Sequence, residues 1–244
     1  MKEKTDLKAV RSVANVLLLT DVHETEFSPL IVQHPFTATG LVGIRRNGET
    51  AMVDITKDAK NLREWQDFIS GQIETAGSVR DIYNMINKPY AMTFVEYAKH
   101  HLSREDFSDL LADAWMRSEN PNNDANLSKG ELVAMFKAAD QTCLMEASEL
   151  NELHGLDDTV TVYRGVTPYN GKNIRALSWT LEPRTAEWFA NRFGEEGTVY
   201  EATIDKSHIL ALFNGRNEAE VIVDPKYLRD IEETQEIDEG LSLQ

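Results

Sequence analysis

Apolar and polar positions first alternate with a strand-like period and then repeat with a helical one. Residues 28–57 contain three β-type runs, SPLIVQ, GLVGIRR and ETAMVDIT, and the pair Asn47-Gly48 between the last two predicts a β-hairpin. From about residue 58 to 153 the apolar positions recur at helical spacing, as in Leu62, Trp65, Ile69 and Ile73. The first part of the chain is therefore expected to be a β-rich segment followed by helices.

The pattern returns to strands from residue 159. The runs TVTVYRGV, IRALSWT, GTVYEATI, HILALF and AEVIV are short and β-type, and the segment PRTAEWFANRF between them is helical. Pro183 suits the first turn of that helix, and Gly194 suits its end. A helical region followed by a β-rich region predicts an α+β protein.

These changes of pattern predict the domain boundaries. Residues 1–57 are expected to form a small β-rich N-terminal extension. Residues 58–235 are expected to form the main domain, with a helical lobe over 58–157 and a β core over 158–235. Residues 236–244 form an acidic tail. The extension could dock a target or cover the helical lobe, and we favour the second interpretation.

Charge is distributed unevenly along the 244 residues. The net charge is −16, and the tail beyond Arg229 carries six acidic residues and no basic one, whereas residues 159–229 are neutral. No basic stripe is visible that could meet phosphates, so we expect no nucleic-acid partner. An acidic surface suits a basic protein partner, although acidity also favours solubility.

Cysteine content and hydropathy indicate the compartment. The single Cys143 excludes an intramolecular disulfide and a cysteine-rich zinc site, and its helical surroundings predict a buried, inert thiol. The segment MKEKTDLKAVRS lacks the apolar core of a secretion signal, and no run approaches 18 apolar residues. We therefore expect a cytoplasmic protein with no membrane partner.

Two motifs resemble metal sites. NPNNDANLSKGE, residues 120–131, resembles a calcium loop, but Ala125 stands where that loop needs glycine. Ser128 and Glu131 instead predict a capping box that starts the next helix. The pair His100-His101 has no ligand partner one helical turn away. We expect no metal.

Three polar elements follow one another in the last third of the chain. Arg164 ends a β-run and precedes Gly165, and an arginine fork there could clamp phosphate. Strand alternation then places the hydroxyls of Ser178 and Thr180 on one face, opposite Trp179. Each element alone would also fit a solvated strand.

The third element is a pair of glutamates. Alternation predicts that Glu218 and Glu220 share one face of a strand that continues into Val221-Ile222-Val223. Between the hydroxyl strand and these glutamates, Phe189 and Arg192 lie on one stripe of the predicted helix. An arginine inside an aromatic stripe must meet water or an anion.

The ordered set of Arg164, Ser178-x-Thr180 and Glu218-x-Glu220 resembles the Arg–Ser–Glu class of mono-ADP-ribosyltransferases. That family includes arginine-modifying bacterial toxins and phage-encoded transferases. The resemblance covers about residues 159–229, and it implies an ADP-ribosyltransferase-like fold with a β-sandwich that binds NAD. Trp179 replaces the family's middle hydroxyl, and the segment from Arg164 to Ser178 is shorter than in the toxins.

The resemblance implies a role for each residue of the set. Glu220 would stabilise the ribosyl cation, Ser178 would hold Glu220, and Glu218 would orient and deprotonate the acceptor. The residues that would bind NAD as substrate are Arg164, Gly165, Ser178, Trp179, Thr180, Phe189 and Arg192, with both arginines on the pyrophosphate and Phe189 on the nicotinamide ring.

The family's glutamate at the first position of the Glu-x-Glu pair goes with an arginine acceptor. We therefore expect transfer of ADP-ribose to an arginine of a protein, and residues 213–217 would touch that target. Two alternatives stay open. An NAD glycohydrolase would use the same residues, and a non-catalytic interaction module would use the same fold, although the retained Arg164, Ser178, Glu218 and Glu220 favour an active site.

Overall fold

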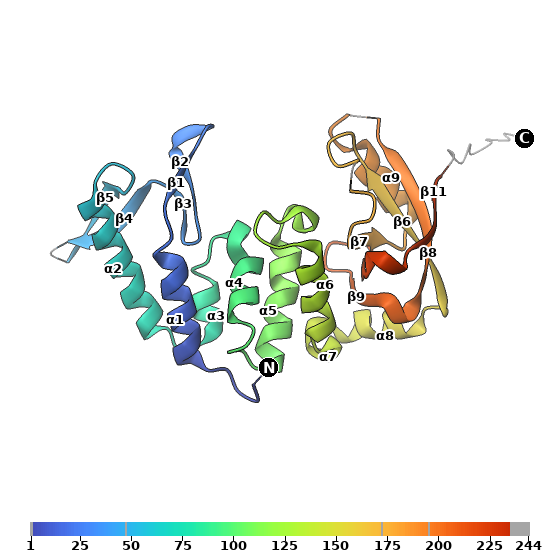
Figure 1. Cartoon of the computed structure of the whole chain (residues 1–244), viewed down its shortest axis with the longest axis horizontal. Coiled ribbons are helices and arrows are strands. Elements are labelled where there is room, and N and C mark those ends of the chain that lie inside the picture. Colours follow the sequence, from blue (N-terminus) through green and yellow to red (C-terminus); the bar gives the residue numbers. More distant parts are fainter. Residues whose placement is uncertain (1, 47, 172, 195, 235–244) are drawn as a thin grey trace, which may run out of the picture. The chain divides into compact units, whose positions relative to one another are not determined.

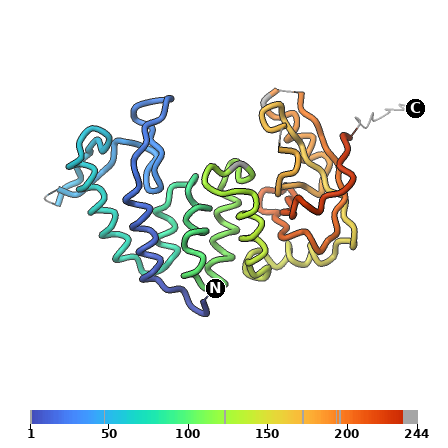
Figure 2. The backbone as a smooth tube through the Cα atoms, viewed as in Figure 1, coloured from blue at the N-terminus to red at the C-terminus, as the bar shows by residue number. Residues whose placement is uncertain are grey.

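The computed structural model describes residues 2–46, 48–171, 173–194 and 196–234. The chain contains helices and antiparallel strands, which confirms the predicted α+β class (Figures 1 and 2). It divides into two compact units, Met1–Leu127 and Ser128–Gln244. This division lies within the predicted helical lobe, so the compact units differ from the predicted domains. The predicted acidic tail, 236–244, lies outside the described residues.

The first unit contains five α-helices and five strands among its described residues. The helices are α1 (Leu7–Leu18), α2 (Ala59–Thr75), α3 (Val79–Tyr83), α4 (Ala91–Ala98) and α5 (Arg104–Arg117), with 3-10 turns at Lys88–Tyr90 and Pro121–Asn123. The strands are β1 (His23–Thr25), β2 (Ser28–His34), β3 (Thr37–Thr39), β4 (Leu41–Arg46) and β5 (Glu49–Asp54). β1, β2 and β3 form one sheet, and β4 pairs with β5.

The predicted hairpin is confirmed. β4 pairs with β5 in antiparallel register from Leu41 opposite Asp54 to Arg46 opposite Glu49. Asn47, at the predicted turn, lies outside the described residues.

The prediction for residues 1–57 was incomplete because it missed helix α1. Asp6 caps this helix by accepting a hydrogen bond from the amide of Ala9. Its buried side chains, Val10, Ala14, Leu17 and Leu18, follow helical spacing. Figure 2 shows α1 alongside the other helices of the unit, and it contacts α2, α3 and α4. Residues 1–57 thus supply part of the helical core.

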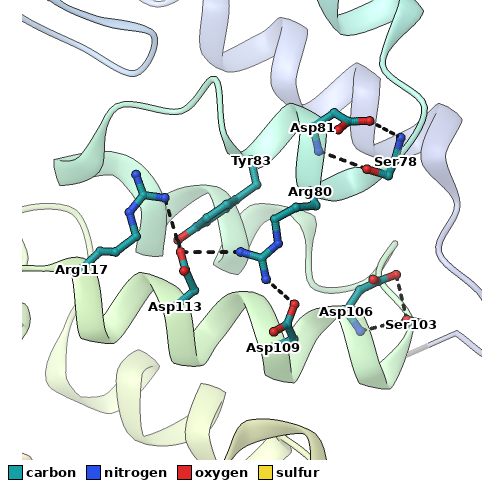
Figure 3. Close-up of polar contacts among 9 residues, drawn as sticks. All are labelled: Ser78, Arg80, Asp81, Tyr83, Ser103, Asp106, Asp109, Asp113 and Arg117. Atoms are coloured by element: carbon teal, nitrogen blue, oxygen red, sulfur yellow. Dashed lines mark hydrogen bonds and ion pairs between the residues drawn. The ribbon is translucent and has the colours of Figure 1, made fainter. Parts of the chain in front are cut away.

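A polar cluster joins α3 to α5 in this unit (Figure 3). We call it the α3–α5 cluster and define it as Arg80, Tyr83, Asp109, Asp113 and Arg117. The Tyr83 hydroxyl donates to Asp113 at 2.5 Å, and Arg117 pairs with the same carboxylate at 3.3 Å. Arg80 pairs with Asp109 and lies 3.6 Å from Asp113. Burial, followed by the bond to Asp113, raises the pKa of Tyr83 and keeps its phenol protonated.

The second unit begins with three helices and continues into a sheet. Its helices are α6 (Lys129–Ala138), α7 (Gln141–Leu144), α8 (Ala147–Gly155) and α9 (Pro183–Asn191), with 3-10 turns at Arg192–Gly194, Lys206–His208 and Pro225–Tyr227. Its strands are β6 (Thr159–Val166), β7 (Ser178–Thr180), β8 (Thr198–Asp205), β9 (Ile209–Phe213), β10 (Glu220–Val223) and β11 (Arg229–Glu233).

The six strands form one antiparallel sheet in the order β11-β8-β6-β7-β10-β9. The hydrogen-bonded ladder is therefore continuous, whereas the predicted β-sandwich needs two separate sheets. β10 lies between β7 and β9 although it follows both in the sequence. This placement brings residues far apart along the chain onto neighbouring strands.

Helix α9 lies very close to the sheet, and glycine makes this approach possible. A Cβ built on Gly165 of β6 would lie 2.0 Å from the carbonyl oxygen of Ala186 and 2.5 Å from the amide nitrogen of Ala190. A Cβ on Gly197 would lie 2.2 Å from the carbonyl oxygen of Ala190. No side chain fits at those distances, so both glycines are required for the helix to pack against the strands.

The predicted helix boundaries of this unit are mostly confirmed. Ser128 and Glu131 form the expected capping box of α6, and Pro183 occupies the first turn of α9. The helical stretch around Cys143 is broken into α6, α7 and α8, and the Cys143 side chain is partly exposed, not buried as predicted. Among the described residues, no helix has both the length and the apolar character needed to cross a membrane.

Candidate active site

Three neighbouring strands each contribute one residue of the predicted set. Arg164 comes from β6, Ser178 is the first residue of β7, and Glu220 is the first residue of β10. β7 pairs with β6 through Tyr163 and Thr180, and it pairs with β10 through Thr180 and Glu220. We call Arg164, Ser178 and Glu220 the strand site.

Hydrogen bonds connect the strand site in a chain. Nη1 of Arg164 donates to the backbone oxygen of Ser178 at 2.6 Å, and Oγ of Ser178 donates to Oε1 of Glu220 at 2.6 Å. The Glu220 side chain is only 6 % exposed. A buried carboxylate held by a hydroxyl in this way has a fixed position, which is the property needed to stabilise a developing positive charge.

Arg164 is partly buried and incompletely hydrogen bonded. Burial lowers the pKa of its guanidinium to about 10, and the charge of Glu220 opposes that effect, so the group stays charged at neutral pH. Its Nε is buried without a hydrogen-bond partner, and the bond to Ser178 is the only one that the guanidinium makes to described residues. A guanidinium with unused donors is suited to binding the oxygens of an anion.

Lys129 adds a second positive charge near Arg164. Burial is the larger cause that lowers the pKa of Lys129, and repulsion by Arg164 acts in the same direction. The ammonium donates to Oδ1 of Asn173 and to the backbone oxygen of Arg175, both at 2.7 Å. Lys129 was not among the predicted site residues, because it lies at the start of a helix 35 residues before Arg164.

The prediction that Glu218 and Glu220 share one strand face is wrong. β10 starts at Glu220, and Ala219 and Asn217 before it have left-handed backbone angles, with φ of 43° and 55°. Strand alternation therefore does not apply to Glu218. Asparagine tolerates the left-handed region, whereas for alanine it is unfavourable by about 1–2 kcal/mol, so the strain in this loop lies at Ala219.

An arginine that the sequence analysis did not single out brings the two glutamates together. Nη2 of Arg216 lies 3.0 Å from Oε2 of Glu218 and 3.2 Å from Oε2 of Glu220. The Glu218 side chain is 23 % exposed and that of Arg216 is 38 % exposed, so the group borders solvent. The spacing of Arg216, Glu218 and Glu220, two residues apart, was the available signal.

Helix α8 and strand β7 anchor this loop. The amide of Asn214 donates to the buried Glu149 at 2.6 Å, and its side chain donates to Glu152 at 3.0 Å. The amide of Ala219 in turn donates to Oδ1 of Asn214 at 3.1 Å. Both ends of the strained segment are therefore held, which explains how the left-handed angles persist.

Thr180 positions Glu218. Its hydroxyl donates to the backbone oxygen of Glu218 at 2.6 Å and accepts from the amide of Glu182 at 3.0 Å. Both bonds go to backbone groups, and Thr180 is buried. The hydroxyl therefore fixes the loop in this structure.

Two other predicted binding residues have structural contacts. Trp179 is 2 % exposed and donates from its indole to the backbone oxygen of Ala176 at 3.0 Å. Gly165 accommodates α9. Binding of NAD by Gly165, Trp179 and Thr180 stays a prediction.

Phe189 lies near the end of α9, whereas Arg192 follows the helix in the 3-10 turn Arg192–Gly194, so the prediction that both lie on one helical stripe is wrong, although the two side chains are in contact. The guanidinium carbon of Arg192 is 5.3 Å from the centre of the Phe189 ring, a cation–π distance. Arg192 is close enough to Glu218 to affect it electrostatically. Burial raises the pKa of Glu218 and Glu220 adds to this, whereas Arg216 and Arg192 oppose it. A carboxylate with a raised pKa is a stronger base than an ordinary one.

No protein-family model, no curated protein and no solved structure matches this chain. Within the described part of the chain, no group of three or more histidine, cysteine, aspartate or glutamate side chains could hold a metal ion. The argument for function therefore depends on the geometry of the strand site and its neighbours.

Proposed function

We propose that this protein is an NAD-dependent mono-ADP-ribosyltransferase that moves ADP-ribose to an arginine side chain and releases nicotinamide. The finer fold assignment, an ADP-ribosyltransferase-like β core within the α+β class, belongs to the same proposal. The observation that carries it is the hydrogen-bonded chain from Arg164 through Ser178 to Glu220. The resemblance names these three residues from their order in the sequence, and they lie on adjacent strands.

Glu220 would act on the ribose of NAD. When the bond between nicotinamide and ribose breaks, nicotinamide leaves with the bonding electron pair and the ribosyl carbon becomes positive. A fixed, buried carboxylate stabilises that cation more than it stabilises neutral ribose, which lowers the barrier. Ser178 would hold Oε1 of Glu220, and a ribose hydroxyl would take the place of Arg216 at Oε2.

Cations near the strand site would bind the pyrophosphate of NAD. Arg164 has unused donors, Lys129 adds charge beside it, and Arg192 lies close to Glu218. Phe189, with Arg192 over its ring, offers a flat apolar surface for nicotinamide. Together these residues would contact the pyrophosphate and the nicotinamide ring of one NAD molecule.

Glu218 would receive the proton of the acceptor. A guanidinium is a poor nucleophile until it loses a proton, and a nearby carboxylate with a raised pKa accepts that proton more readily. Glu218 is also more exposed than Glu220, as a residue that meets an incoming side chain must be.

The test is incubation of the purified chain with NAD labelled in the adenosine part, together with a cell lysate or the small guanidine agmatine. We expect nicotinamide release and label on protein or agmatine. Free ADP-ribose without any labelled acceptor would instead identify an NAD glycohydrolase. Absence of all turnover would contradict both enzymatic functions and favour a non-catalytic module.

Glu218→Gln separates transfer from hydrolysis. We expect transfer to agmatine to fall by about 100-fold because the proton acceptor is lost, while part of the nicotinamide release survives because Glu220 remains. Both rates are measured in the same reaction. An equal fall in the two rates would remove Glu218 from the acceptor side of the mechanism.

A further inference from the structure

The position of Arg216 has a consequence for the acceptor side of the proposed reaction. The same nitrogen, Nη2, lies 3.0 Å from Glu218 and 3.2 Å from Glu220. An acceptor arginine must place a guanidinium nitrogen beside Glu218, which takes its proton, and beside Glu220, which stabilises the ribosyl cation. Arg216 meets both requirements within its own chain.

We propose that Arg216 is itself an acceptor, so that the protein transfers ADP-ribose from NAD to its own Arg216 within one molecule. This inference rests on the proposed function. It adds a modification site and identifies a guanidinium as the chemical class that fits between the two carboxylates.

Binding of NAD would leave Arg216 in an attacking position. A ribose hydroxyl that takes up Oε2 of Glu220 replaces the Arg216 contact there, which at 3.2 Å is the longer of the two. The contact with Glu218 at 3.0 Å does not involve that oxygen and can persist. The guanidinium then lies beside the ribosyl carbon while it still contacts the carboxylate that accepts its proton.

The reaction balances without an oxidant or a reductant. The bond between the ribosyl carbon and nicotinamide breaks, and nicotinamide leaves with the electron pair. Nη2 of Arg216 forms a new bond to the same carbon. Its proton passes to Glu218 and from there to water.

The surrounding loop favours reaction within one chain. Asn214 is anchored to α8 through Glu149 and Glu152, and Ala219 is hydrogen bonded to Asn214, so the backbone on both sides of Arg216 is held. The Arg216 side chain is 38 % exposed, and its only contacts to described residues are those with the two glutamates. A side chain held beside two reacting groups has a high effective concentration.

Arg229 provides a matched control. It is also exposed and paired with a carboxylate, lying 2.6 Å from Asp205 with half of its side chain accessible. It belongs to β11, and the strands β8, β6 and β7 separate β11 from β10 in the sheet. Arg216→Lys therefore changes the proposed acceptor, and Arg229→Lys makes the same chemical change at a position away from it.

The experiment incubates the full chain with NAD, with and without agmatine, and maps modified arginines by fragmentation mass spectrometry. We expect ADP-ribose on Arg216. The fraction of chains modified per minute should not change over a tenfold range of protein concentration. Modification at position 216 should disappear in Arg216→Lys and persist at Arg216 in Arg229→Lys. Folding of each variant is checked by its circular dichroism spectrum.

The possible failures are distinguishable. Nicotinamide release or agmatine labelling without ADP-ribose on Arg216 of the wild-type chain would overturn this inference and leave the proposed function intact. A fractional rate that rises with protein concentration would overturn reaction within one chain. Absence of turnover with every acceptor would overturn the proposed function itself, and this inference with it.

Discussion

The α3–α5 cluster and the strand site both place carboxylates among arginines, but they are built on different backbones. In the α3–α5 cluster, Asp109, Asp113 and Arg117 follow one another at four-residue spacing on a single helix. In the strand site, the residues come from three strands, and a loop with two left-handed residues supplies the neighbouring Glu218.

The hydrogen bonding of the two regions differs as well. The carboxylate of Asp113 meets Tyr83, Arg80 and Arg117, a set of partners that joins two helices (Figure 3). Arg164 in the strand site keeps a buried Nε without a partner. Fully paired charges on regular helices indicate a structural role, whereas unused donors beside a strained loop indicate a site for a ligand.

The largest expected effect compares two carboxylate-to-amide changes. Glu220→Gln should lower NAD cleavage by about 100-fold to 1000-fold and leave the melting temperature nearly unchanged, because it removes the charge that in the proposed reaction would face the ribosyl cation. Asp113→Asn should lower the free energy of unfolding by about 1–3 kcal/mol and leave kcat of the folded protein unchanged. Nicotinamide release and thermal unfolding measure both. Loss of activity in Asp113→Asn at a temperature where it is folded would contradict the distinction.

A second comparison replaces one arginine in each region. Arg164→Lys keeps a charge but loses the planar fork, so we expect the dissociation constant of NAD to rise by about tenfold, measured by calorimetry. Arg80→Lys should leave that constant unchanged, since its carboxylate partners belong to the α3–α5 cluster. Equal NAD affinity in wild type and Arg164→Lys would exclude Arg164 from NAD binding.

The pH dependence of the transfer rate should follow the ionisation of the Glu218 carboxyl group. Transfer needs the ionised carboxylate, and the pKa of Glu218 is raised, so the rate should increase with pH through a pKa above the ordinary glutamate value. The native state also binds this proton more tightly than the unfolded chain does. Protonation of Glu218 therefore contributes to the free energy of unfolding below the ordinary glutamate pKa, and this contribution is lost as the pH rises through the raised pKa of the folded state.

Glu218→Gln is the control for the pH profile, because it has no group that titrates at this position. The acid limb of the residual transfer should disappear in this variant. If the acid limb remained in Glu218→Gln, the titration that produces it would belong to a group other than Glu218.

The smallest effect tests the strained loop. Ala219→Gly relieves an unfavourable φ of 43°, which offsets the entropic cost of glycine, so stability should change by less than about 0.5 kcal/mol or increase. Ala134→Gly, at an exposed position inside α6, should lower the free energy of unfolding by about 1 kcal/mol. Denaturant unfolding measures both. An equal loss in the two variants would contradict strain at Ala219.

Local patterns predicted the regular parts of the chain. Period-two alternation gave the hydroxyl of Ser178 and the buried ring of Trp179 opposite faces, and the capping box at Ser128 marked the start of α6. Helix α1 could have been found, since Asp6 precedes a regular apolar stripe. The resemblance contributed the pairing of Ser178 with Glu220, which no local pattern contains.

The irregular parts could not be predicted. Alternation assumes a strand, and Ala219 leaves the strand conformation, so the position of Glu218 depends on bonds from Thr180 and Asn214 that join distant segments. The contact of Arg216 with both glutamates follows from that loop geometry. Long-range contacts of this kind have no periodic signal in the sequence.

The place of β10 in the sheet determines when the strand site can exist during synthesis. Arg164 and Ser178 lie on strands that leave the ribosome first, whereas Glu220 opens a strand that must insert between β7 and β9 after both have emerged. Pairings between distant segments form late because their loop closure is costly. A growing chain that has not yet reached residue 220 lacks the buried carboxylate, so only a chain that has completed this insertion contains all three residues of the strand site.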